Sequence, residues 1–145
     1  MTKRFYIPAE GPDVKALHIA LYGASVLAKE YKSEIILIVP TLKHASGTIL
    51  SKVLKGESLK KLVKGASLKY DNAPIRMVST QTFDPYRDNG VLVALWAGNN
   101  MLKKIDQSDD AIGVLALRWV GSEVEDWASK HKATKLQDSS PQNAE

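Results

Sequence analysis

The sequence contains no cysteine, so disulfide bonds and thiolate chemistry are excluded. It also lacks a membrane span, because its longest apolar runs, residues 35–40 and 91–97, fall far short of the roughly 20 residues required. The opening MTKRFYIPAE has no long apolar segment of the kind found in signal peptides. We therefore expect a cytoplasmic protein with no membrane partner.

Motifs of known chemistry are missing as well. The chain has neither the P-loop pattern GxxxxGK[ST] nor the dinucleotide-binding pattern GxGxxG. It has no HExxH motif and no GxSxG motif. No cluster of histidines and acids has metal-ligand spacing, so no metal site is expected. The sequence names no cofactor and leaves open whether the protein is an enzyme.

Positive charge is concentrated in one segment. The 145 residues carry a formal net charge of +4. Residues 42–70 alone hold seven lysines against one acid, Glu57. Such a segment is most often a solvated helix face, although it can also attract phosphates or nucleic acid. It contains no aromatic side chain before Tyr70, which weakens an interpretation as a single-strand binding surface.

Apolar patterning predicts strands that alternate with helices. Strands are expected near residues 5–7, 34–40, 75–82, 91–97 and 112–119. Helices are expected over residues 14–32 and 48–66 (the latter kinked or split at Gly56), after a cap at Asn99 or Asn100, and from Ser122. The pattern favours a single three-layer α/β/α domain, residues 1–132, with a mostly parallel five-stranded Rossmann-like sheet in the order 3-2-1-4-5. Residues 133–145 lose periodicity and are expected to form a flexible tail.

The third predicted strand leaves one connection with two alternatives. If it ends early, near Val78, the following residues are long enough for a crossover to a parallel strand. If it runs to Phe83, an antiparallel hairpin into the next strand fits instead. Its poor alternation of apolar and polar residues suits an edge strand.

A ligand site is expected where the carboxyl ends of parallel strands meet, between strands one and four in this order. Gly98-Asn99-Asn100 follows a strand and opens a helix, so its backbone N–H groups could meet an anion, although a plain strand-to-helix turn needs the same residues. Among the loop residues, Glu10 could bind a ribose or take a proton, and His44 is the one histidine on a predicted site loop. The candidate ligand-binding residues are Glu10, Gly11, Thr41, Lys43, His44, Thr48, Gly98, Asn99 and Asn100.

The first 41 residues contain YIPAEG, the helix ALHIALYGASVLAKEY and the strand EIILIVPT. These features resemble the opening of universal stress proteins and their adenine-nucleotide-binding relatives. The resemblance implies a Rossmann-like fold and an adenine nucleotide near Glu10, where that family has an acidic residue. The family's glycine-rich phosphate loop is replaced here by a single Gly98 before two asparagines. A ligand would then be held by Asn99, Asn100 and the backbone, with help from Glu10.

Three hypotheses for function follow. The first is binding of a nucleotide or another small phosphorylated molecule at the carboxyl edge of the sheet. The second is a non-catalytic interaction module that forms homo-oligomers through helix 14–32, where Ile19, Tyr22 and Val26 make a second apolar flank. The third is association with nucleic acid through the lysines of residues 42–70, with binding that weakens steeply as salt rises.

Overall fold

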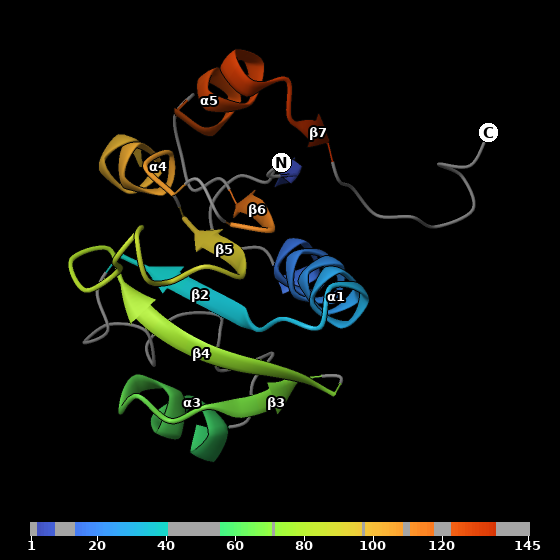
Figure 1. Cartoon of the computed structure of the whole chain (residues 1–145), viewed down its shortest axis with the longest axis vertical. Helices are drawn as coiled ribbons and strands as arrows, with labels where there is room; N and C mark the ends of the chain where they lie inside the picture. The colour runs from blue at the N-terminus through green and yellow to red at the C-terminus, as the bar shows by residue number, and fades with distance from the viewer. Residues whose placement is uncertain are drawn as a thin grey trace.

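The computed structural model describes residues 3–7, 14–40, 56–70, 72–96, 98–108, 111–117 and 123–135. Within them the chain forms an α/β fold, with a mixed sheet and helices on both of its faces (Figure 1). The strands are β1 (Lys3–Ile7), β2 (Ile35–Val39), β3 (Leu68–Tyr70), β4 (Ala73–Ser79), β5 (Val91–Leu95), β6 (Gly113–Leu117) and β7 (Thr134–Lys135). The helices are α1 (Val14–Glu30), α3 (Gly56–Val63), α4 (Asn99–Ile105) and α5 (Glu123–His131).

The strands lie in the order β3-β4-β2-β5-β6-β1-β7. The predicted order 3-2-1-4-5 is therefore wrong in one respect: β1 lies beyond β6 instead of between β2 and β5. The residues explain this position. Every residue of β2 and of β5 is buried, whereas β1 carries an exposed Lys3 and a partly buried Arg4. The two most apolar strands take the centre of the sheet, and the strand with charged residues lies farther out.

Two short strands had no signal in the sequence. β3 pairs antiparallel with β4, so β4 is not the edge strand that its poor alternation suggested. β7 pairs parallel with β1 and occupies the start of the predicted tail, whose residues 136–145 lie outside the described residues. Strands of two or three residues are too short to show a period of two.

The connection from β4 to β5 follows the early-ending alternative. β4 ends at Ser79, and both β4 and β5 pair parallel with β2, so residues 80–90 cross over β2. Phe83 from this crossover is buried on the same side of the sheet as α4 and α5. Arg76 of β4 ties the crossover to the sheet. Its guanidinium donates hydrogen bonds to Asp88 in the crossover and to Glu34, just before β2.

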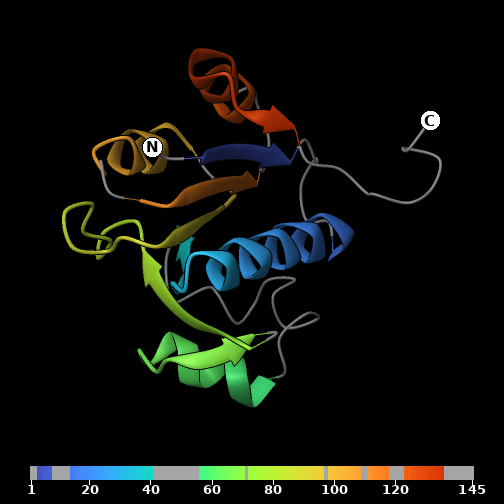
Figure 2. The same cartoon turned by 45° about the vertical axis from the view of Figure 1, so that its right-hand side comes forward.

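Helices cover both faces of the sheet (Figure 2), and an apolar core lies on each face. On one face α1 and α3 pack through residues such as Leu17, Leu21 and Leu62. On the other face α4 and α5 pack through residues such as Leu102 and Trp127. Strand residues alternate between the two cores, as expected for strands covered on both sides. None of the described helices is both long and apolar enough to cross a bilayer.

Candidate functional site

The switch point of the sheet lies between β2 and β5. The chain leaves β2 toward β4 with α3 on one face, and it leaves β5 toward β6 with α4 on the other. Neighbouring strands whose connections depart in opposite directions mark the place where open α/β sheets bind ligands, at the carboxyl ends of the strands. The sequence predicted the switch point between β1 and β5. It lies between β2 and β5, because β1 is not in the centre of the sheet.

Trp96 follows β5 at this place and has a left-handed backbone conformation, with φ of 53°. Both Leu95 and Trp96 belong to the core on the α1 side, so the left-handed residue breaks the alternation of the strand. A bulky side chain at positive φ costs on the order of 1–3 kcal/mol and persists only when the surroundings hold it. The carboxyl end of the central strand β5 is therefore a point of stored strain.

The three turn residues predicted to bind a ligand are all described. Gly98 is the N-cap of α4, with an extended φ of −110° and no side chain to cap the helix. Asn99 and Asn100 are exposed and lie inside the first turn of α4, so neither asparagine is the cap that the sequence suggested. Because α4 has seven residues, its dipole is small, and side chains must supply most of the binding energy for a ligand.

The other six candidate residues lie outside the described residues. In the sequence, Thr41, Lys43, His44 and Thr48 follow β2, which borders the switch point. Glu10 and Gly11 follow β1, which β6 separates from β5. The prediction placed Glu10 opposite the Gly98 turn because it made β1 and β5 neighbours, whereas β6 lies between these two strands in the structure.

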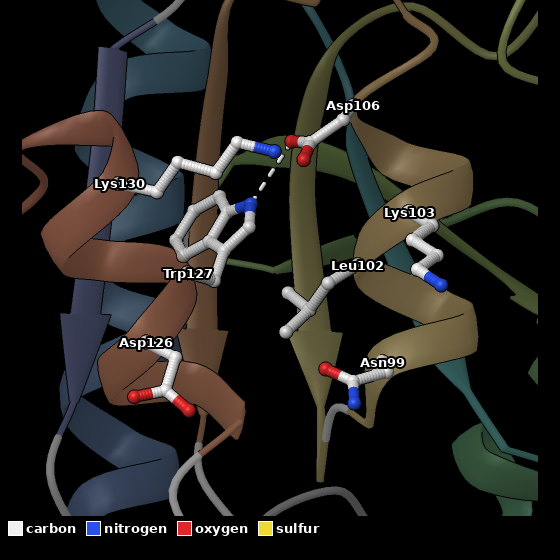
Figure 3. A pocket seen from close by; sticks show the side chains of 7 residues that line it. All are labelled: Asn99, Leu102, Lys103, Asp106, Asp126, Trp127 and Lys130. Carbon is white, nitrogen blue, oxygen red and sulfur yellow. Dashed lines mark hydrogen bonds between the residues drawn. The ribbon is translucent and has the colours of Figure 1, made fainter.

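A groove of about 180 Å³ runs between α4 and α5 (Figure 3). Leu102 and Trp127 form its apolar part, and both side chains are almost fully buried. Asn99 lies at the carboxyl edge of the sheet, and in Figure 3 its amide shares that end of the groove with Asp126. Of the predicted site residues that the structure describes, Asn99 alone lines this groove. The described residues that line it are Asn99, Leu102, Lys103, Asp106, Asp126, Trp127 and Lys130.

Asp106 closes the other end of the groove and joins the two helices. Its Oδ1 accepts a hydrogen bond of 2.9 Å from the indole Nε1 of Trp127. Its Oδ2 lies 3.0 Å from Nε2 of His131, and the rings of His131 and Trp127 are 5.4 Å apart. Both carboxylate oxygens of Asp106 are therefore engaged within the protein.

Two lysines bring positive charge to the groove. Lys130 extends toward Asp106 in Figure 3, and Lys103 lies on α4 one residue beyond Leu102. The ion pairs between described residues involve Arg76, Arg87 and His131. Neither lysine ammonium therefore has a described carboxylate within 4.0 Å. Lysine ammonium groups on flexible stems act as mobile point charges that suit an anion. The groove thus offers an amide, an apolar wall, two cations and the carboxylates of Asp106 and Asp126.

The carboxyl end of β4 is held against α4 by a third lysine, Lys104. Nζ of Lys104 donates hydrogen bonds to the carbonyl oxygens of Thr80 and Gln81, at 2.7 and 3.1 Å. The N–H of Thr80 bonds in turn to the carbonyl of Val39 at the end of β2. Lys104 therefore fixes α4 over the carboxyl ends of β4 and β2, next to the switch point.

In the part of the chain that the structure describes, no three His, Cys, Asp or Glu side chains gather in a way that could hold a metal ion. The sequence did not predict Asp106, Lys103 and Lys130 as site residues, because only the packing of α4 against α5 brings them together. One signal pointed to them: a buried Trp127 needs an acceptor for its indole N–H, and Asp106 supplies it.

The chain matches no protein-family model, no curated protein and no solved structure.

Proposed function

We propose that this protein binds a small phosphorylated molecule, such as a nucleotide, at the carboxyl edge of its sheet, beside the switch point. The observation that carries the proposal is the adjacency of β2 and β5, whose connections leave to opposite faces. The strained Trp96 supports it, since strain of this kind concentrates at functional sites. The resemblance of the first 41 residues to universal stress proteins favours an adenine nucleotide within this class.

The groove beside the switch point gives the ligand its chemistry. Lys103 and Lys130 favour negative charge, and the Asn99 amide can donate to or accept from a phosphate ester or a ribose hydroxyl. Trp127 and Leu102 offer apolar contact. At about 180 Å³ the groove is smaller than the roughly 300–1,000 Å³ of sites for drug-sized ligands. It therefore suits a compact phosphorylated group.

Thermal unfolding in the presence of ligands tests the proposal. The panel contains adenine and guanine nucleotides, sugar phosphates and inorganic phosphate at millimolar concentration. A ligand present at 100 times its Kd stabilises the folded state by about 2.7 kcal/mol. For a chain of this size that corresponds to a rise in Tm of roughly 5–10 °C. If no member of the panel raises the Tm, the proposed function is wrong.

Two neighbouring asparagines provide the matched pair of variants. Asn99→Ala removes an amide that lines the groove, whereas Asn100→Ala removes one that does not. Both residues are exposed in the first turn of α4, so their effects on stability should be similar. We expect Asn99→Ala to reduce the ligand-induced rise in Tm and Asn100→Ala to leave it intact. The opposite result would place the ligand outside the groove.

A second candidate function is self-association through α1. Tyr22 is 64% exposed and Val26, one turn later, is 43% exposed. Ile19 packs partly against the core, so the apolar flank predicted from the sequence is narrower than expected. Light scattering of Tyr22→Glu against the original chain tests this candidate, with Tyr86→Glu as a control at an exposed tyrosine of the crossover. A monomer in all three samples would reject it.

A further inference from the structure

The helix α3 presents two contrasting faces at one edge of the sheet. Leu59 and Leu62 are buried against β4 in the core that α3 shares with α1. Lys60, Lys61 and Lys64 are exposed. The lysines occupy positions three and four residues apart, so their side chains are neighbours on the helix surface. In Figure 1, α3 lies at the β3 end of the molecule, away from α4 and α5.

The charge on this face is not neutralised by the described residues. None of the three lysines makes a side-chain hydrogen bond or ion pair with a described residue; the described ion pairs involve Arg76, Arg87 and His131. Between residues 57 and 70 the one acid is Glu57, in the first turn of α3. The face therefore carries three lysines, which span roughly 6 Å along the helix axis, against the single acid Glu57.

We propose that the exposed face of α3 binds the phosphate backbone of double-stranded nucleic acid without reading its sequence. This inference is independent of the proposed small-molecule site, which lies on the opposite face of the sheet. Duplex DNA carries one negative charge for about every 1.7 Å of its axis, so three closely spaced ammonium groups meet several phosphates at once. Lysine contacts of this kind position a protein on the backbone and carry no base specificity.

The composition of the face favours a duplex over other polyanions. Single-stranded nucleic acid is usually held by exposed aromatic side chains on which bases stack. α3 has no aromatic residue, and Tyr70 of the neighbouring β3 packs partly against the core. Protein interfaces are anchored by buried aromatic or apolar residues and are depleted in lysine. The described part of α3 exposes charge and no large apolar side chain.

Fluorescence anisotropy with a labelled DNA duplex of about 20 base pairs, at about 50 mM salt, measures the interaction. Three phosphate contacts predict an affinity that falls by about 40-fold between 50 and 200 mM salt. The triple variant K60Q/K61Q/K64Q should weaken binding at 50 mM salt at least about tenfold and remove most of the salt dependence. Circular dichroism and the Tm check that the triple variant folds. If it does not fold, the single variant K64Q is measured in its place.

Lys69 provides a matched control for Lys64. It is also exposed, but Leu68 and Tyr70 on either side of it pack toward the α3 core, so Lys69 projects from the opposite face of β3. K64E and K69E change the net charge equally. We expect K64E to weaken duplex binding severalfold more than K69E. Equal losses would assign binding to net charge alone and reject the α3 face.

Two competitors separate the classes of partner. If polyglutamate displaces the duplex at an equal concentration of charge, the face binds acidic protein and the proposal is wrong. If single-stranded DNA binds more tightly than the duplex, the assignment to a duplex is wrong. No binding of duplex at about 50 mM salt with protein in the range of about 100 µM, the weak end of non-specific affinities, would also overturn the proposal.

Discussion

Nη2 of Arg76 lies 2.8 Å from Oδ1 of Asp88, whose side chain is only 1% exposed. The other oxygen of Asp88 accepts a hydrogen bond of 2.8 Å from the N–H of Asp84. Arg76 also pairs with Glu34, just before β2. This network ties the crossover of residues 80–90 to two strands of the sheet. A parallel connection with no helix of its own among its described residues is thereby held in place by charge-assisted hydrogen bonds.

The buried carboxylate of Asp88 should be important for stability. Asp88→Ala leaves the N–H of Asp84 and part of the Arg76 guanidinium without their acceptor, so we expect a loss of about 2–4 kcal/mol in the free energy of unfolding. Arg87, 3.5 Å from the same carboxylate but largely exposed, is the control. Arg87→Ala should cost less than about 1 kcal/mol. Urea unfolding measures both, and equal losses would contradict the assigned role of Asp88.

The same carboxylate should make the protein sensitive to acid. Burial by itself disfavours the charged form of Asp88, but the hydrogen bond from Asp84 and the pairing with Arg76 outweigh it, so the pKa of Asp88 is lowered from 3.8. A carboxyl with a lower pKa in the folded state contributes stability above its unfolded pKa and loses it as the pH falls through the folded value. We expect Asp88→Asn to reduce the loss of stability below about pH 4. A parallel acid profile in the variant would contradict this.

Two glycines should respond differently to alanine. A Cβ at Gly90 would lie 2.7 Å from the carbonyl oxygen of Glu34, a backbone atom that cannot move aside easily. A Cβ at Gly98 would meet no atom within 4 Å. We expect Gly90→Ala to destabilise the fold by about 1–3 kcal/mol and Gly98→Ala, which changes the N-cap of α4 without a clash, by at most about 1 kcal/mol. Comparable Tm values for the two variants would contradict this packing.

The link between α4 and α5 can be measured by a double-mutant cycle on Asp106 and His131. Their carboxylate and imidazole are 3.0 Å apart, so we expect a coupling of about 0.5–1.5 kcal/mol. Asp106→Ala alone should cost more, because it also removes the acceptor of the buried Trp127 indole. Lys103→Ala, in the same groove, should change stability by less than about 0.5 kcal/mol. If the effects of the changes at Asp106 and His131 are additive, this pair does not couple the helices.

The elements of this fold follow from local patterns, whereas their order in the sheet does not. The apolar runs of β2, β5 and β6 and the stripe containing Leu17 and Leu21 of α1 are visible in the sequence. Strands that are apolar on both faces fit many neighbours equally well, so periodicity could not choose between β1 and β5 as the partner of β2. The charge of Lys3 and Arg4 was the signal that β1 lies away from the centre.

The candidate site was predictable at its turn and not at its groove. A strand followed by glycine and asparagine marks a strand-to-helix turn, so Gly98 and Asn99 could be identified from local residues. Asp106 and Trp127 meet across 21 residues of sequence, and their contact depends on how α4 packs against α5. A contact that depends on tertiary packing produces no periodic pattern in the sequence of either helix.

The position of β1 has a consequence for how the chain folds. Lys3 pairs with Gly113, and Phe5 pairs with Thr134 of β7. During synthesis β1 therefore has no partner until β6 has been made, whereas β2, β4 and β5 can already pair with one another. Contacts so distant in sequence slow folding, and an unpaired strand is open to association with other chains. Of the described strands, β1 is the first to be synthesised and is thus among the last to join the sheet.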